Sequence, residues 1–332
     1  MKTILALDPT GDAAVRARLL LRRREVFDLE RSWQVEAYAG FEWDDNVTLE
    51  SGVNEVLPSN QEDFRGLWGL AASARTWATE RVSLSLGFRH DQTKHDKLGQ
   101  FDLISDSLFG SITMRSSGWL SGRLDVVAYN TLQDLDAEAT GGLIRPNLII
   151  AFRQRWGVLR TFAQFEGTEY HDHTTFAPLE RDAISYSFGF QHFLPLRRRD
   201  SWSAVSVSWA RTLTQARPGG GPDGFDGDFD YDSWRVRANT RLALPWQIQG
   251  QLDVSYAHDD YRNDNLLHAI ETLGEIRKRR DDTLIGRIGI SRPILNHVKV
   301  EVYYRGTRRF SNIDLFDYDK HLVGVLLRFS TN

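Results

Sequence analysis

The sequence predicts an all-β protein: a transmembrane, antiparallel, up-and-down β-barrel of about 14 strands, preceded by a short N-terminal helical segment. Three observations predict this fold class. From Trp33 onward, apolar and polar residues alternate with a period of two in one segment after another. The connections between these segments alternate between long and short. No apolar run approaches the roughly 20 residues that a membrane helix needs, whereas membrane strands give only a weak hydropathy signal.

Residues 1–31 differ in pattern from the rest of the chain. Ala13, Ala14, Leu19 and Leu20 recur at helical spacings. Asp8 precedes Pro9, a pair that can cap and open a helix. We therefore expect residues 1–31 to form one helix or a helical pair, and residues 32–332 to form the barrel.

The alternating segments are the expected strands. In chain order they cover Trp33–Trp43, Arg65–Ala78, Val82–Phe88, Leu108–Met114, Leu120–Ala128, Ile144–Phe152 and Leu159–Phe165. The series continues with Ile184–Phe190, Val205–Trp209, Trp234–Leu244, Trp246–Tyr256, Leu284–Ile290, Val298–Tyr304 and Val323–Phe329. An even number of strands is typical of single-chain bacterial outer-membrane barrels.

The connections indicate how the strands are arranged. A long segment with many Asp, Glu and Asn residues follows the first strand, whereas little more than Thr79 and Glu80 follows the second. This alternation continues to the end of the chain, including a long loop over "NTLQDLDAEATGG" and a turn at Pro245. Because consecutive antiparallel strands put alternate connections at opposite ends, the long loops share one end. Outer-membrane barrels place long loops outside and short turns in the periplasm. Both chain termini are therefore expected in the periplasm of a Gram-negative cell.

Two soluble all-β architectures compete with the membrane barrel. A propeller blade would repeat a Trp-Asp or Gly-His signature, and no such signature recurs. A sandwich core needs bulky side chains, because gaps in a packed core carry a cavity cost. The apolar face here repeatedly includes small residues such as Gly122, Ala163 and Gly250. Lipid tolerates small residues, so the pattern favours a membrane barrel.

In a membrane barrel the polar face lines the lumen and aromatic residues form girdles at both interfaces. The residues expected to line the lumen are Arg235, Arg237, Asn239, Arg241, Gln247, Gln249, Gln251, Asp253, Lys299 and Glu301. The residues expected in the girdles are Trp33, Trp43, Trp234, Trp246, Tyr256 and Phe329. The row of arginines predicts an anion preference if the lumen is open.

Composition excludes several classes of function. The chain has no cysteine, which rules out disulfides, thiolate metal sites and cysteine nucleophiles. A net charge of -4 gives no indication of nucleic-acid binding. No catalytic triad, phosphate-binding glycine loop or pair of catalytic carboxylates is evident, so neither an enzyme nor a cofactor is predicted. The sequence after Met1 lacks the long apolar stretch of a signal peptide. If the protein is exported, we expect this sequence to be its mature part.

Several polar runs have both a binding interpretation and a simpler, solvated one. An acidic loop carries Asp223, Asp226, Asp228, Asp230 and Asp232, which suits calcium, although its spacing does not match the helix-flanked calcium loop. His90, His95, His171 and His173 are metal-ligand types, but solvated loop histidines are more common. The run Arg277–Asp282 is expected in a long loop, facing lipopolysaccharide phosphates or solvent. Arg197–Arg199 is expected on the periplasmic side, near a partner or anionic headgroups.

The two ends of the barrel region resemble a known family. "SWQVEAYAGFEWDDNV" follows a helical segment containing "LALDP", and "TRRFSNIDLFDYDKHLVGVLLRF" lies close to the C-terminus. These stretches are similar to the barrel ends of the surface lipoprotein assembly modifier family, which joins a periplasmic tetratricopeptide-type helical domain to a 14-stranded outer-membrane barrel. Exopolysaccharide export porins share this layout. The resemblance implies that residues 1–31 are a remnant of such a helical domain.

The expected function follows from the barrel and this resemblance. We expect a conduit that delivers proteins or lipoproteins to the cell surface, with exopolysaccharide export or general diffusion of solutes as alternatives. The expected partners are outer-membrane lipid and lipopolysaccharide, a passenger protein or polysaccharide, and a periplasmic partner at the N-terminal helix.

Overall fold

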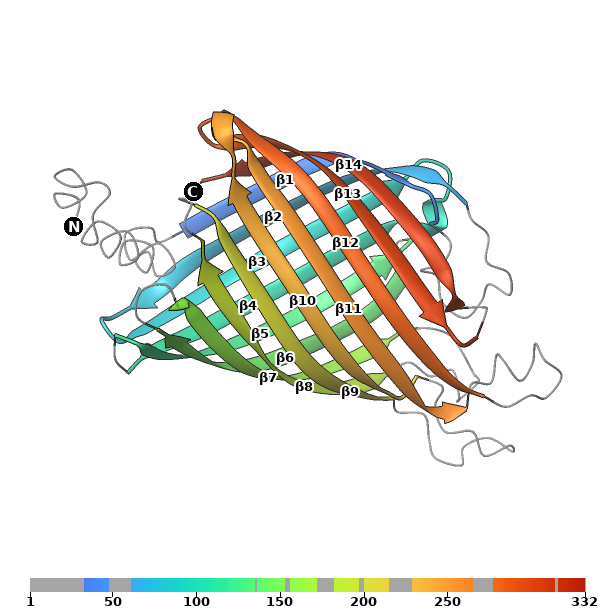
Figure 1. The fold of residues 1–332 in the computed structure, drawn as a ribbon, viewed down its shortest axis with the longest axis horizontal. Coiled ribbons are helices and arrows are strands. Elements are labelled where there is room, and N and C mark those ends of the chain that lie inside the picture. The colour runs from blue at the N-terminus through green and yellow to red at the C-terminus, as the bar shows by residue number, and fades with distance from the viewer. Residues whose placement is uncertain are drawn as a thin grey trace.

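The chain forms a closed barrel of fourteen antiparallel strands, in which each strand pairs with its neighbours in sequence (Figure 1). The first strand also pairs with the last, from Glu36 opposite Ser330 to Asp44 opposite Leu322. The predicted fold class is confirmed. The computed structural model describes residues 33–47, 61–116, 118–134, 136–152, 156–171, 182–196, 200–214, 229–264, 277–313 and 316–331. The predicted helical segment 1–31 lies outside these residues.

The strand bounds agree with the expected segments in number and order, and most strands are longer than expected. The first seven are β1 (Trp33–Asp44), β2 (Asp63–Ala78), β3 (Val82–His95), β4 (Leu103–Arg115), β5 (Leu120–Gln133), β6 (Asp136–Ala151) and β7 (Val158–Tyr170). The last seven are β8 (Ala183–Pro195), β9 (Trp202–Thr214), β10 (Tyr231–Ala243), β11 (Gln249–Asp264), β12 (Lys278–Leu295), β13 (Val298–Ser311) and β14 (Tyr318–Ser330).

Connections fall alternately at the two ends of the barrel. Residues 79–81, 116–119, 244–248 and 296–297 belong to connections at one end, which we call the short-turn end. The start of β1 and the end of β14 lie at this same end, because Glu36 is opposite Ser330. Residues 45–62, 215–230 and 265–277 connect strands at the other end, which we call the long-loop end.

Two segments expected in long loops are strand instead. The sequence predicts a long loop after Ala128, but β5 and β6 remain paired up to Gln133 opposite Asp136. The run Arg277–Asp282 is also expected in a loop, yet β12 begins at Lys278. Backbone pairing continues here beyond the apolar part of the wall. At the start of β12, residues 278–283 are polar on both strand faces, so the alternation that marks a strand in the sequence is lost there.

The β10–β11 connection also differs from the prediction. The sequence places Trp246 and Gln247 in a strand, but Pro245–Gln247 form one turn of 3₁₀ helix and β11 begins only at Gln249. Trp246 and Gln247 have φ values of 56° and 61°, in the left-handed region, which reverses the chain direction. Pro245 lacks a backbone N–H and cannot continue the ladder. Gln247, which was expected to line the lumen, is therefore an exposed turn residue.

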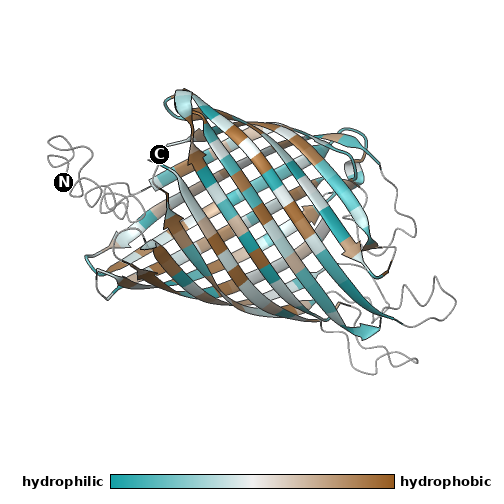
Figure 2. Ribbon diagram, in the orientation of Figure 1, coloured by the Kyte–Doolittle hydropathy of each residue, from teal (hydrophilic) through white to brown (hydrophobic). Residues whose placement is uncertain are grey.

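The outer face of the barrel is apolar and exposed. On β10, Trp234 is 54% exposed, and Val236 and Leu242 on the same face are also exposed. Figure 2 shows hydrophobic patches recurring on strands across the wall, with hydrophilic strand ends toward the long loops. Water-soluble monomers rarely expose so much contiguous apolar surface, whereas a lipid-facing wall requires it. None of the helices in the described ranges is long and apolar enough to cross a membrane.

The inner face holds the buried residues. Leu67 on β2, Tyr303 on β13 and Leu326 on β14 form a small buried cluster, against which Tyr38 of β1 packs. The Tyr303 ring lies over Gly324, where a Cβ atom would come within 2.5 Å of the ring. Large side chains therefore cover the inner face of the wall where the first and last strands meet.

Candidate functional site

The polar residues of β10, β11 and β13 face the interior of the barrel. Asp253 is only 8% exposed and Glu301 only 6%, while Leu252, Val254 and Val302 next to them in sequence are exposed. Because side chains alternate between the faces of a strand, the two buried carboxylates mark the inward face. The expected lumen residues on this face are Arg235, Arg237, Asn239, Arg241, Gln249, Gln251, Asp253, Lys299 and Glu301.

The expected girdle residues lie on the opposite, outward face or in turns. Trp33 begins β1 and Trp43 lies close to its other end, so the two rings are near opposite ends of the wall. Trp234, Tyr256 and Phe329 are exposed on their strands. Trp246 is 80% exposed in the β10–β11 turn rather than in a strand. The contact of these rings with lipid headgroups stays a prediction.

Two carboxylates, Asp253 and Glu301, hold three of the arginines on the β10–β14 wall. Asp253 accepts hydrogen bonds from Arg237 Nη2 at 2.5 Å and from Asn239 Nδ2 at 2.5 Å. Glu301 accepts from Arg287 Nη2 and from Arg328 Nε, each at 2.7 Å. Each carboxylate thus fixes residues from neighbouring strands, and it neutralises only part of the positive charge around it.

A small pocket of about 90 Å³ lies at the short-turn end of this wall. Its lining includes five of the expected lumen residues, namely Arg241, Gln249, Gln251, Lys299 and Glu301. The Arg241 guanidinium donates a hydrogen bond to the Gln249 side chain. The pocket therefore combines two cationic side chains with two amides, and its carboxylate is already bound to two arginines.

A second cationic cluster, on β5–β7, was not predicted. It consists of Arg123, Asp125, Arg145, Asn147 and Arg160, which converge across three strands. Arg123 Nε donates to Asp125 Oδ1 at 2.6 Å, and Arg160 Nε donates to Asn147 Oδ1 at 2.7 Å. The sequence signal was present, because these residues alternate with lipid-facing ones such as Leu124, Pro146 and Leu148. For these three strands, the prediction named the apolar residues and none of the residues that face the lumen.

Charged residues near the long-loop end form balanced networks. Asp44 is fully buried between Lys320 Nζ at 3.1 Å and Arg65 Nη1 at 3.6 Å. Glu42 accepts from Arg65 Nη2 at 2.7 Å and from the Tyr303 hydroxyl. These contacts join β1, β2, β13 and β14 and so brace the closure of the barrel.

Positive charge prevails toward the short-turn end. There the inward-facing cations among the described residues are Arg75, Arg115, Arg123, Arg145, Arg160, Arg237, Arg241, Lys299 and Arg328. The inward-facing carboxylates in the same part of the described wall are Glu36, Asp125, Asp253 and Glu301. A field of one sign within low-dielectric walls concentrates ions of the opposite sign. The short-turn half of the lumen therefore attracts anions.

The histidines and acidic residues singled out from the sequence do not form a metal centre in the described ranges, which contain no group of three metal-ligating side chains. His90 pairs with Asp106 at 2.8 Å on the outward face, and His95 approaches Asp102 at 3.3 Å. Asp230 accepts hydrogen bonds from Thr214, and Asp232 pairs with Arg211 at 2.7 Å. His173, Asp223, Asp226, Asp228 and Arg197–Arg199 lie outside the described residues.

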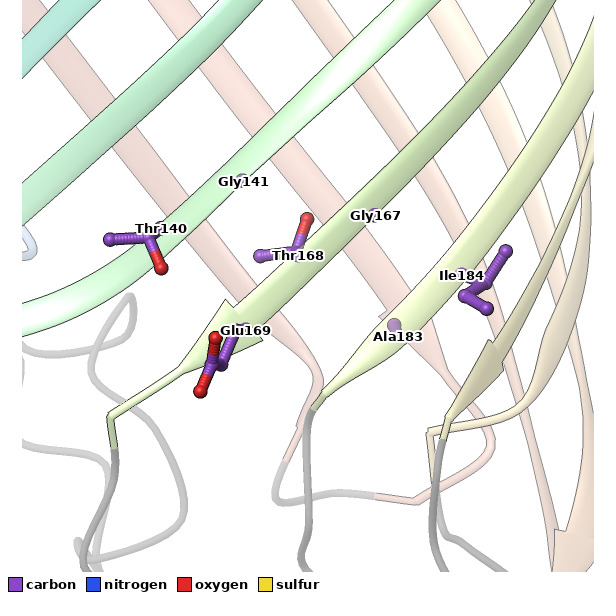
Figure 3. Close-up of a pocket in the computed structure, with 7 residues that line it drawn as sticks. All are labelled: Thr140, Gly141, Gly167, Thr168, Glu169, Ala183 and Ile184. Carbon is purple, nitrogen blue, oxygen red and sulfur yellow. The ribbon is translucent and has the colours of Figure 1, made fainter.

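A larger pocket of about 460 Å³ lies at the long-loop ends of β6, β7 and β8 (Figure 3). Small residues create it, because Gly141, Gly167 and Ala183 leave the wall thin. Thr168 and Glu169 point to opposite sides of β7, so they do not converge on one ligand (Figure 3). This pocket lacks the converging polar groups of a binding site.

Comparison with known proteins gives a likeness of fold. No protein-family model and no curated protein matches the sequence. A Pseudomonas aeruginosa FadL homologue has a TM-score of 0.44 and 10% identity, over 91% of this chain and 90% of the other. Acinetobacter baumannii OccAB3 has a TM-score of 0.44 and 9% identity, over 90% and 99%. The P. aeruginosa outer membrane protein opdK has a TM-score of 0.40 and 8% identity, over 90% and 98%.

The geometry of the barrel indicates the class of protein to which the chain belongs. A closed barrel leaves no unpaired strand edge, which is the condition for strands to cross a bilayer. Its outer face is apolar and its inner face is charged. The chain is therefore a fourteen-stranded transmembrane β-barrel of the outer-membrane type.

Proposed function

We propose that the protein is an outer-membrane channel that passes small solutes through its lumen and prefers anions. The observation that carries this proposal is the excess of inward-facing cations over carboxylates toward the short-turn end. The interior of an eight-stranded barrel is just wide enough for side chains to fill. A barrel of fourteen strands is wider and therefore encloses more space. In this proposal the barrel lies in the Gram-negative outer membrane, contacts lipid and lipopolysaccharide, has both termini in the periplasm, and performs no catalysis.

Conductance in planar bilayers tests the proposal. Across a gradient of potassium chloride, we expect a reversal potential displaced toward the chloride equilibrium potential. Replacing Arg241 and Lys299 together by Gln should reduce that displacement. Arg280→Gln is a matched control, because Arg280 lies on the outward face and pairs with Asp260 at 3.1 Å. A cation-preferring current, or no current, would contradict the proposal.

Delivery of proteins or lipoproteins to the cell surface is the second candidate, with exopolysaccharide export beside it. Its support is the helical pattern of residues 1–31 and the resemblance of the barrel ends to the surface lipoprotein assembly modifier family. A strain lacking the gene separates these functions. Loss of surface lipoproteins or of exopolysaccharide would favour delivery, whereas a loss confined to uptake of small anions would favour the channel.

A further inference from the structure

We infer that the β5–β7 wall holds an oxyanion-binding site, built from Arg123, Arg145 and Arg160 around Asp125 and Asn147. Its ligand is the carboxylate or phosphate group of a small solute. We call these five residues the Arg145 site. The inference deepens the proposed channel function and rests on it for the route by which the solute arrives.

The one carboxylate of the Arg145 site is already occupied. Asp125 Oδ1 accepts from Arg123 Nε at 2.6 Å, and Asp125 Oδ2 accepts from Asn147 Nδ2 at 2.9 Å. Arg160 donates instead to Asn147 Oδ1 at 2.7 Å, and its Nη2 lies 3.9 Å from Asp125 Oδ2. Asn147 also donates to the carbonyl oxygens of Arg123 and Arg145. The network therefore orients two guanidiniums without neutralising both.

The hydrogen bonds around Asp125 and Asn147 do not include the Arg145 guanidinium. It lies directly opposite Asp125 in the β5–β6 register, so it belongs to the same patch of wall. Its Nε is buried and has no hydrogen-bond partner among the described residues. A buried donor without an acceptor destabilises the folded state. The penalty is larger for a guanidinium that lies beside two others, because its charge is also uncompensated. A ligand oxyanion would supply both the missing acceptor and the missing negative charge.

The residue types suit oxyanions in particular. Guanidinium groups bind carboxylate and phosphate through paired N–H donors, which a chloride ion cannot match. Three guanidiniums and one carboxylate give the site a net formal charge of about +2. In the ring of fourteen strands β6 lies seven places from β13, so the Lys299 wall faces the site across the lumen. That wall raises the local concentration of anions and leaves recognition to the arginines.

The test is titration calorimetry on the detergent-solubilised full chain, with inorganic phosphate and, separately, with succinate, in a constant chloride background. We expect saturable binding of at least one of them. Binding of phosphate alone assigns a phosphate-bearing solute, and binding of succinate alone a carboxylate. Arg145→Gln should weaken the affinity about tenfold, the loss of one charge-assisted hydrogen bond. Arg235→Gln, an inward-facing change on β10, should alter it less than twofold.

A second variant separates binding from a purely structural role. Asp125→Asn removes the competing negative charge and should tighten anion binding, whereas a wall network without a ligand predicts no gain. Heat-modifiable migration on gels checks that each variant is folded. The inference is overturned by the absence of saturable binding, by equal losses in Arg145→Gln and Arg235→Gln, or by weaker binding in Asp125→Asn. Anion conductance without saturable binding would refute the Arg145 site and leave the channel function standing. Saturable binding without conductance would support the site and refute the channel function.

Discussion

A charge placed on either face of strand β12 tests which side of the wall meets lipid. Ile288 faces outward, is 57% exposed, and lies between Leu252 and Tyr304 on the neighbouring strands. Ile285 lies three residues earlier on the inward face, opposite Ser255. Ile288→Arg and Ile285→Arg are therefore the same chemical change, placed against opposite surroundings.

The structure gives the expected size of the effect. On the outward face of β12, Asp282 and Arg292 bracket the apolar stretch. Their ten-residue separation corresponds to ~25 Å along the membrane normal, at ~3.3 Å per residue and a tilt of ~40°. This matches the apolar band of about 25 Å in outer-membrane barrels. Ile288 lies ~10 Å from the level of Arg292 on the same arithmetic, close to the midplane.

An arginine near the midplane costs ~2–4 kcal/mol of folding free energy. At about 1.4 kcal/mol per factor of ten, this is roughly a 30- to 700-fold change in the folding equilibrium. Ile285→Arg should cost much less, because its guanidinium reaches the polar lumen. Equilibrium unfolding in urea, with refolding into phospholipid vesicles, measures both. A larger loss for Ile285→Arg would place the hydrophobic core inside and refute the membrane orientation.

Three further changes test the interior and the β10–β11 turn, each by the same unfolding measurement. Gly324→Ala should cost about 1–3 kcal/mol, because its Cβ would meet the Tyr303 ring, and Tyr303→Ala in the same chain should recover part of the loss. Glu301→Gln should cost about 1–3 kcal/mol by leaving two arginines without their carboxylate, and should strengthen anion preference in bilayers; an unchanged reversal potential would argue against a conducting lumen there. Gln247→Gly should stabilise by about 0.5–1 kcal/mol, since glycine adopts a φ of 61° freely, whereas Gln251→Gly inside β11 should destabilise.

Periodicity determined the number of strands and the outward face, and together with the lengths of the connections it determined the fold class. A residue such as Val236 shows its orientation through its neighbours in sequence, because side chains alternate along any strand. The order of long and short connections likewise predicted which ends lie together, since antiparallel neighbours must alternate. The same reasoning placed Arg237 and Asp253 on the inward face, and the structure brings them within hydrogen-bond distance.

Only the tertiary structure decided features that depend on partners far away in sequence. The register in which β1 pairs with β14, and the extension of β5 and β6 to Gln133 and Asp136, are set by pairing that no local pattern encodes. The left-handed conformations of Trp246 and Gln247 follow from the need to join two strands at fixed spacing, although neither residue favours them. The placement of Arg145 opposite Asp125 depends on the register of neighbouring strands, which sequence spacing does not specify.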